Sequence, residues 1–235
     1  MSIDQKINTI GDLEFKVIYS RRRTIGISVL PDASVVIRVP YVTSLKTISR
    51  IVHEKYSWIL KHRDNYKRLD NGTLNKSFTA GETHLYRGNR SVLRIEKTMK
   101  SYIRFSDNTI ELGTEKTDDP QVIKRLLYKG YKNEASKLLP ELMTKVLREH
   151  ENQEFKPAGL VIRTMKRRWG SCSNKGIITL STELIKLADK YIEYVITHEL
   201  CHLQHHNHSA QYYKLLTEVF PEWKTVRKEL RKYIQ

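Results

Sequence analysis

The stretch that decides the fold is YIEYVITHELCHLQHHNH, residues 191–208. Apolar residues lead into an H-E-x-x-H pattern formed by His198, Glu199 and His202. On a helix, residues four apart lie one above the other on one face, so the imidazoles of His198 and His202 can point at a single metal ion. Glu199 directly follows the first histidine, where a general base is needed to take a proton from an activated water molecule. The pattern therefore predicts a metal-dependent hydrolase.

A third metal ligand is expected on the C-terminal side of the pattern. His208 follows His202 by six residues, a distance that lets a turning chain bring a third imidazole to the metal. Glu218 and Glu222 are alternatives, because some zinc hydrolases use a downstream glutamate as the third ligand. His206 is another alternative, one helical turn after His202. These choices stay open on spacing alone.

The chain is strongly basic, with 42 Lys and Arg residues against 26 Asp and Glu residues, a net charge of +16 and a pI of about 9.7. Its hydrophobic fraction of 39% and charged fraction of 29% are ordinary for a folded protein and exclude wholesale disorder. No apolar run approaches the roughly 20 residues of a membrane helix, and no signal-peptide core is visible. We therefore expect a cytoplasmic protein without membrane contact, whose charge favours polyanionic partners such as nucleotides or nucleic acid.

The two cysteines, Cys172 and Cys201, are expected to be free thiols, since two residues cannot make a disulfide framework and the cytoplasm is reducing. Cys201 precedes His202 and therefore points away from the ligand face of the helix. It is expected to be a small packing residue.

The first half of the chain reads as strands with one long helix. Alternating apolar residues over 13–40 predict a hairpin or meander, and Ser44 is the expected N-cap of a helix over about 45–68. Short strands are expected between residues 78 and 113. The polar segment 115–119 lacks apolar periodicity and predicts a boundary between lobes. The lobes are residues 1–117 and residues 118–235.

The second half reads mainly as helices around a short β-hairpin. A helix should begin at Asp119-Pro120 and be kinked or broken at Pro140. The glycine-punctuated loop after residue 168 predicts a hairpin over 160–180, with Gly170 serving the turn and Ile177–Leu180 offering an edge to an extended peptide. Further helices are expected over about 190–205, over about 209–219 with Ser209 at its start, and from Pro221 to the end.

Three segments of the second half resemble the YgjP-like metallopeptidase family, a relative of the SprT-like and other zincin proteases. They are RWGSCS (residues 168–173), YVITHELCHL (residues 194–203) and NHS (residues 207–209), the last followed by an aromatic residue. In the first half, SRRRTI (residues 20–25), the valine strand ending at Pro40 and EKYSWI (residues 54–59) resemble the opening lobe of the same family. The resemblance covers nearly the whole chain.

The resemblance implies an α+β fold in which a mixed, β-rich N-terminal lobe packs on a helical, zincin-like catalytic lobe with a short β-hairpin. It also implies a zinc ion held by the residues that match His198, His202 and His208, with Glu199 as the base. We therefore expect a zinc metallopeptidase that acts on a peptide or protein substrate. A developing oxyanion needs a further donor, and the candidates for contact with the substrate are Arg168, Tyr212 and Tyr213.

Two other functions remain open. Some proteins of this family are described as nucleotide pyrophosphatases with UTP as substrate, and Arg21–Arg23 and Lys166–Arg168 could grip its phosphates. The positive charge would also suit a DNA-associated protein with a zinc site.

Overall fold

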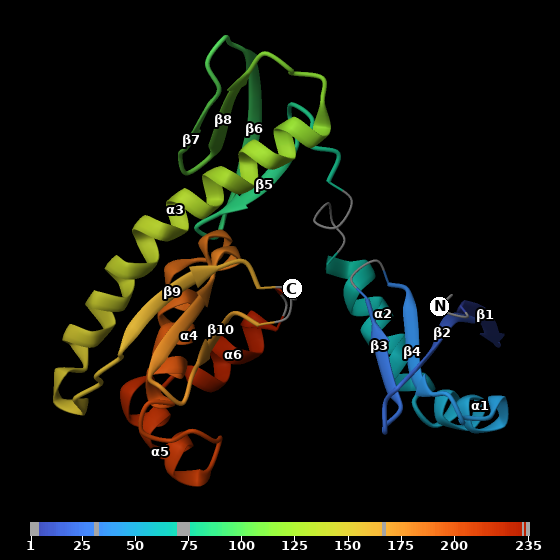
Figure 1. Ribbon diagram of the computed structural model, residues 1–235. Helices are drawn as coiled ribbons and strands as arrows, with labels where there is room; N and C mark the ends of the chain where they lie inside the picture. Colours follow the sequence, from blue (N-terminus) through green and yellow to red (C-terminus); the bar gives the residue numbers. More distant parts are fainter. Residues whose placement is uncertain (1–4, 31–32, 70–75, 166–167, 232, 234–235) are drawn as a thin grey trace. The chain divides into compact units, whose positions relative to one another are not determined.

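The computed structural model describes residues 5–30, 33–69, 76–165, 168–231 and 233. Its helices and three mixed sheets form an α+β fold, as predicted (Figure 1). The chain divides into two compact units, Met1–Asn75 and Lys76–Gln235. The predicted lobe boundary at residue 117 falls inside the second unit, because the strand before it and the helix after it pack against each other.

The sheet of the first unit has the strand order β1-β2-β4-β3. Of the hairpin or meander predicted over 13–40, the hairpin is confirmed for β3 and β4, which pair antiparallel. A meander of all three strands is wrong, since β2 runs parallel to β4 and does not pair with β3. Val35, Val36, Ile37 and Val39 are all buried, which is typical of a central strand covered on both faces. The strands are β1 (Gln5–Ile10), β2 (Leu13–Ser20), β3 (Gly26–Val29) and β4 (Val35–Pro40).

Two helices, α1 (Leu45–Glu54) and α2 (Tyr56–Leu69), follow the sheet. Ser44 caps α1 as predicted, because its hydroxyl accepts a hydrogen bond of 3.2 Å from the N–H of Thr47. The single helix predicted over 45–68 is interrupted at Lys55, which lies outside helical geometry. The helices contribute buried aliphatic side chains to the core that the sheet forms with Leu13, Val17 and Ile37; these are Ile48, Val52 and Ile59.

The second unit begins with a sheet of order β5-β6-β8-β7 that packs on the long helix α3 (Figure 1). Asp119 caps α3 as predicted, since its carboxylate accepts hydrogen bonds from the N–H groups of Gln121 and Val122. Proline has no backbone N–H to donate, but the helix continues through Pro140. Packing against two sheets and a second helix holds it on both sides of this residue. The elements are β5 (Thr83–Tyr86), β6 (Asn89–Lys97), β7 (Tyr102–Phe105), β8 (Thr109–Thr114) and α3 (Pro120–Glu149).

The three-stranded sheet of this unit differs from the predicted hairpin over 160–180. Strand β9 (Gly159–Arg163) runs parallel to β11 (Ile177–Ser181), and the hairpin is formed by β10 (Gly170–Cys172) with β11. Because β11 is the central strand, the predicted free edge at Ile177–Leu180 is paired on both sides. The short β10, whose Gly-Ser-Cys sequence has no apolar alternation, is an edge strand instead.

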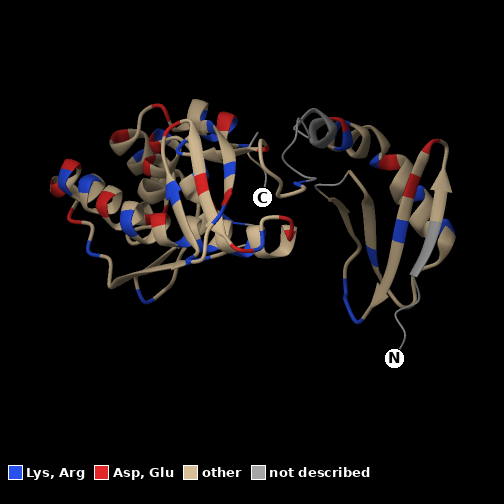
Figure 2. Cartoon of the chain, turned by 90° about the horizontal axis from the view of Figure 1, so that it is seen from above, with Lys and Arg blue, Asp and Glu red and all other residues tan. Residues whose placement is uncertain are grey.

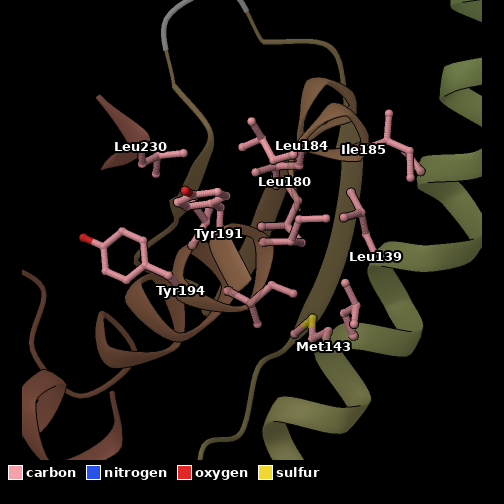
Figure 3. Packing of buried hydrophobic residues seen from close by; sticks show 14 of the residues in the cluster. Leu139, Met143, Leu180, Leu184, Ile185, Tyr191, Tyr194 and Leu230 are labelled. Carbon is pink, nitrogen blue, oxygen red and sulfur yellow. The ribbon is translucent and has the colours of Figure 1, made fainter. Parts of the chain in front are cut away.

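The helices α4 (Asp189–Cys201), α5 (Ala210–Val219) and α6 (Trp223–Leu230) complete the second unit. Short 3-10 helices lie at Glu151–Gln153 and Thr182–Lys186. Leu139 and Met143 of α3 face Leu180 of β11 and the side chains of the following turn, with Tyr191 of α4 beside them (Figure 3). The packing fixes α4 against the rest of the unit. Among the described residues, no helix has both the length and the apolar character needed to cross a membrane.

Candidate metal centre

Helix α4 carries the first half of the H-E-x-x-H pattern and ends earlier than predicted. The helix ends at Cys201 rather than near residue 205, and His202 is its C-cap. His202 still has right-handed helical dihedral angles, φ −69° and ψ −13°, so it stays on the same face as His198. Ser209 then caps α5 by accepting a hydrogen bond from the N–H of Tyr212, which places His208 directly before the new helix.

The structure brings His198, His202 and His208 together. One ring nitrogen from each lies within 4.8 Å of the others, and the Nε2 atoms of His198 and His208 are 3.2 Å apart. Two nitrogens bound to one tetrahedral zinc would be about 3.3 Å apart, given Zn–N distances of about 2.0–2.1 Å. The spacing of His198 and His208 therefore fits a tetrahedral metal ion, and His202 lies within 4.8 Å of both.

Hydrogen bonds at Nδ1 set the tautomers of two of the histidines. Nδ1 of His202 lies 3.0 Å from the carbonyl oxygen of His205, so it must carry a proton and donate. The hydroxyl of Tyr212 donates to the carbonyl of His198 at 3.1 Å and accepts from Nδ1 of His198 at 2.7 Å. Both rings therefore have an unprotonated Nε2, as in metal-binding histidines whose other ring nitrogen is hydrogen-bonded to the protein.

The surroundings of His198 and His208 favour their neutral imidazoles. Burial, followed by the neighbouring His202, His208 and Arg227, lowers the pKa of His198 to about 3. Burial, His202 and Arg227 also lower the pKa of His208. Because a metal binds the unprotonated ring, His198 and His208 are ready to bind a cation near neutral pH without first losing protons.

Glu199 lies beside the cluster and is only 6% exposed. Burial raises the pKa of its carboxyl to about 7, while Arg168 and a hydrogen bond from the backbone N–H of Cys172 act in the opposite direction. A carboxylate whose pKa lies near neutrality is suited to take and return a proton. Glu199 is not one of the three clustered ligands, so it is free for such a role.

Gly170 is required by the approach of Glu199 rather than by a turn, contrary to its predicted role. It begins strand β10. A Cβ atom placed on it would lie 2.8 Å from both Cγ and Oε1 of Glu199. The sequence does not show this close approach, because a glycine in a loop segment is also typical of a turn.

The three predicted substrate contacts lie in different surroundings. Tyr212 is fully buried, and its hydroxyl is occupied by His198, so its contact is with a histidine. Tyr213 is partly buried, and its ring stacks on His208 at 6.0 Å between centroids. Arg168 is exposed and lies close enough to Glu199 to influence its pKa.

The alternative third ligands lie outside the cluster. Glu218 accepts a hydrogen bond of 2.7 Å from Nε2 of Gln153, and Glu222 is the N-cap residue of α6. His206 is exposed and is not part of the cluster. The second half of the chain thus supplies His208 as the third nitrogen. As predicted, Cys201 is buried in the core.

Comparison with known proteins assigns this site to a family. The family model described as "YgjP-like, metallopeptidase domain" matches residues 23–233. The zymogen structure of the metallopeptidase abylysin from Pyrococcus abyssi is 23% identical over 40% of this chain and 91% of its own, with a TM-score of 0.35. That of jannalysin from Methanocaldococcus jannaschii is 22% identical over 42% of this chain and 99% of its own, with a TM-score of 0.36.

A search of curated proteins found no match. At TM-scores as low as those of the two zymogen structures, the assignment rests on the family match alone. That match spans almost the whole second unit and most of the first. The chain therefore belongs to the YgjP-like family and is a metallopeptidase.

Proposed function

We propose that this chain is a zinc-dependent peptidase that uses Glu199 as its general base. The observation that carries the proposal is the convergence of His198, His202 and His208, two of them with tautomers set by hydrogen bonds, beside a buried carboxylate. Three imidazole ligands would leave a zinc ion one open position, as in catalytic zinc sites. When bound, zinc supplies Lewis-acid activation of a water molecule and of the substrate carbonyl. The test is peptide cleavage by the zinc-loaded chain and its loss in Glu199→Gln.

The side chains divide the remaining work. Glu199 takes a proton from water as the water oxygen attacks the peptide carbonyl carbon, and then gives that proton to the leaving amine as the C–N bond breaks. The hydrogen bond from the Cys172 N–H holds the Glu199 carboxylate in place. Gly170 leaves room for this carboxylate because it has no Cβ. Arg168 adds positive charge near Glu199 and favours the deprotonated, basic form of the carboxyl.

Strand β10 is our proposed contact for the backbone of the substrate. It is an edge strand of the three-stranded sheet, and its first residue, Gly170, lies against Glu199. An extended peptide can add to such an edge through main-chain hydrogen bonds. This replaces β11, the strand expected from the sequence, because β11 is paired on both sides.

Tyr212→Phe should weaken zinc binding by about 10- to 100-fold while the protein stays folded. The change keeps the buried ring but removes the hydroxyl that bonds Nδ1 and the carbonyl of His198. Competition with a chelator of known zinc affinity measures the effect. Tyr213→Phe is the matched control, since its hydroxyl contacts Arg227 and no ligand histidine. Equal zinc affinity in wild type and Tyr212→Phe would show that the hydroxyl does not position His198.

Gly170→Ala should lower kcat by about 10²-fold without loss of zinc, the order of effect expected when a catalytic group is displaced by about 1 Å. The added methyl group would lie 2.8 Å from the Glu199 carboxylate and would push it from its position. Peptide cleavage rates and zinc content measure the two effects. Gly159→Ala in the same sheet is the control, because its Cβ would meet no atom within 4 Å. A Gly170→Ala variant with wild-type kcat would contradict the proposed packing.

The polyanion-dependent alternatives receive no specific support from the charge distribution. Lys and Arg are mixed with Asp and Glu along the strands and helices of both units (Figure 2). Two basic segments were expected to grip phosphates, Arg21–Arg23 and Lys166–Arg168. In the second of them, Lys166 and Arg167 lie outside the described residues. We therefore favour a peptide or protein substrate, and pyrophosphatase action on UTP and association with DNA stay predictions from the sequence.

We also place the protein in the cytoplasm as part of this proposal. Its support is that Cys172 and Cys201 are free thiols, as is usual in a reducing compartment. Burial raises the pKa of the Cys201 thiol to about 12, so this cysteine is unreactive and packs in the core.

A further inference from the structure

Arg227 of helix α6 is linked to the metal centre through Tyr213, and no carboxylate of the described residues pairs with it. Its Nη1 donates a hydrogen bond of 3.5 Å to the hydroxyl of Tyr213. The Tyr213 ring in turn stacks on the ligand His208, at 6.0 Å between ring centroids. Among the residues that the structure describes, no Asp or Glu forms an ion pair with Arg227.

Packing holds this arginine in place. Trp223, one helical turn before Arg227, is buried and stacks on Tyr213 with ring centroids 5.0 Å apart. Its indole N–H donates a hydrogen bond of 2.9 Å to the hydroxyl of Thr217 on α5. Residues four apart share a helix face, so Arg227 projects from the same side of α6 as Trp223, toward Tyr213. The guanidinium is therefore presented to the site by a packed helix.

Without a bound substrate, the positive charge of Arg227 is unfavourable for a site that binds a metal cation. A fixed cation near metal ligands opposes the binding of a second cation. Its charge becomes favourable when a negatively charged group enters the site. A guanidinium has five N–H donors in a planar fork, and here only one contact, to Tyr213, is made by a described residue.

We propose that Arg227, together with the Tyr213 hydroxyl, binds a negatively charged oxygen of the peptide substrate at the metal centre. This inference rests on the proposed peptidase function and names a substrate contact for it. Two substrate groups have the required chemistry. One is the carboxylate at the C-terminus of a peptide, and the other is the oxyanion that develops at the attacked carbonyl.

Two probes separate these sources. A phosphonamidate dipeptide with a free C-terminal carboxylate carries both an oxyanion mimic and a carboxylate, whereas its C-terminal amide carries only the mimic. Binding to zinc-loaded wild type, Arg227→Gln and Arg227→Lys would be measured by titration calorimetry. Lys228→Gln removes an exposed charge from the same helix and is the matched control.

Arg227→Gln should bind the carboxylate probe about 10- to 100-fold more weakly than wild type, the range for a lost hydrogen bond to a charged group. Arg227→Lys should recover part of this loss, and Lys228→Gln should bind as wild type does. A loss confined to the carboxylate probe identifies the C-terminal carboxylate, and an equal loss with both probes identifies the oxyanion. Unchanged affinity for both probes, or the same loss in Lys228→Gln, overturns the inference.

Zinc binding separates this inference from the function on which it rests. Arg227→Gln should bind zinc at least as tightly as wild type, because it removes a cation near the ligands. Weaker zinc binding would show instead that Arg227 supports the structure of the site, and would overturn its role as a substrate contact. A wild-type chain that binds no zinc would remove the proposed function itself. If the wild-type chain binds zinc but wild type and Arg227→Gln bind both probes equally well, only the inference is overturned.

Discussion

Glu199→Gln should lower the turnover of a peptide substrate by about 10²- to 10⁴-fold and leave about one zinc ion per chain bound. Glutamine has the shape of glutamate and can still accept the hydrogen bond from the Cys172 N–H, but it cannot take a proton from water. Because Glu199 is not one of the clustered ligands, its replacement should not release the metal. The measurements are initial rates on fluorescence-quenched peptides and zinc content.

Glu193→Gln is the matched control for this change. Glu193 lies on the same helix, but its carboxylate is paired with Lys145 at 2.6 Å. The control should keep turnover near the wild-type value, since an ion pair on the surface contributes about 0–1 kcal/mol to stability. A Glu199→Gln variant that kept more than roughly a tenth of wild-type turnover would fall outside the range for a lost general base and contradict this role.

His198→Ala should abolish both zinc binding and peptide cleavage. His198 contacts His208 through Nε2 and Tyr212 through Nδ1, so its removal takes away one ligand and the hydrogen-bond partner of the Tyr212 hydroxyl. Metal that binds only the folded state stabilises it by about 4 kcal/mol at a free concentration 1,000 times its Kd. Wild type should therefore gain a large rise in Tm on addition of zinc, whereas His198→Ala should gain almost none.

His206→Ala is the control for the loss of a histidine from the same segment. His206 is exposed and lies outside the cluster, so this variant should respond to zinc as wild type does. A similar zinc-induced rise in Tm in His198→Ala would mean that the stabilising metal binds elsewhere. Loss of the response in His206→Ala would mean that the ligand set has been misassigned.

The central geometry of the site could be predicted because it depends on local spacing. His198 and His202 are one helical turn apart, and this relation survives even though α4 ends at Cys201, since His202 keeps helical dihedral angles. His208 was reachable from its distance along the chain, but spacing could not choose it over the glutamates that follow. That choice depends on the turn after His202 and on the cap at Ser209.

Contacts between distant segments could not be read from the sequence. The hydroxyl of Tyr212 reaches a histidine 14 residues earlier, and Gly170 lies against a glutamate 29 residues later. Both depend on how α5 and β10 pack on α4, which no local pattern encodes. No sequence pattern distinguishes Arg227 from the other basic residues, and its link with the site runs through Tyr213, which stacks on His208.

Strand partners were the least predictable part of the fold. The alternation of β2 and the apolar run of β4 identified both as strands, but neither pattern shows that they pair in parallel with β3 on the other side of β4. In the second unit, three residues without apolar alternation form β10 and displace β9 from the predicted hairpin. Alternation reports which face of a strand is buried and does not report its neighbour.

The most direct test of the three-histidine zinc site is the zinc content of protein purified without chelators, measured for wild type, His208→Ala and His206→Ala. We predict about one zinc ion per chain in wild type and in His206→Ala, and almost none in His208→Ala. Zinc retained by His208→Ala, or absent from wild type, would contradict the site proposed here.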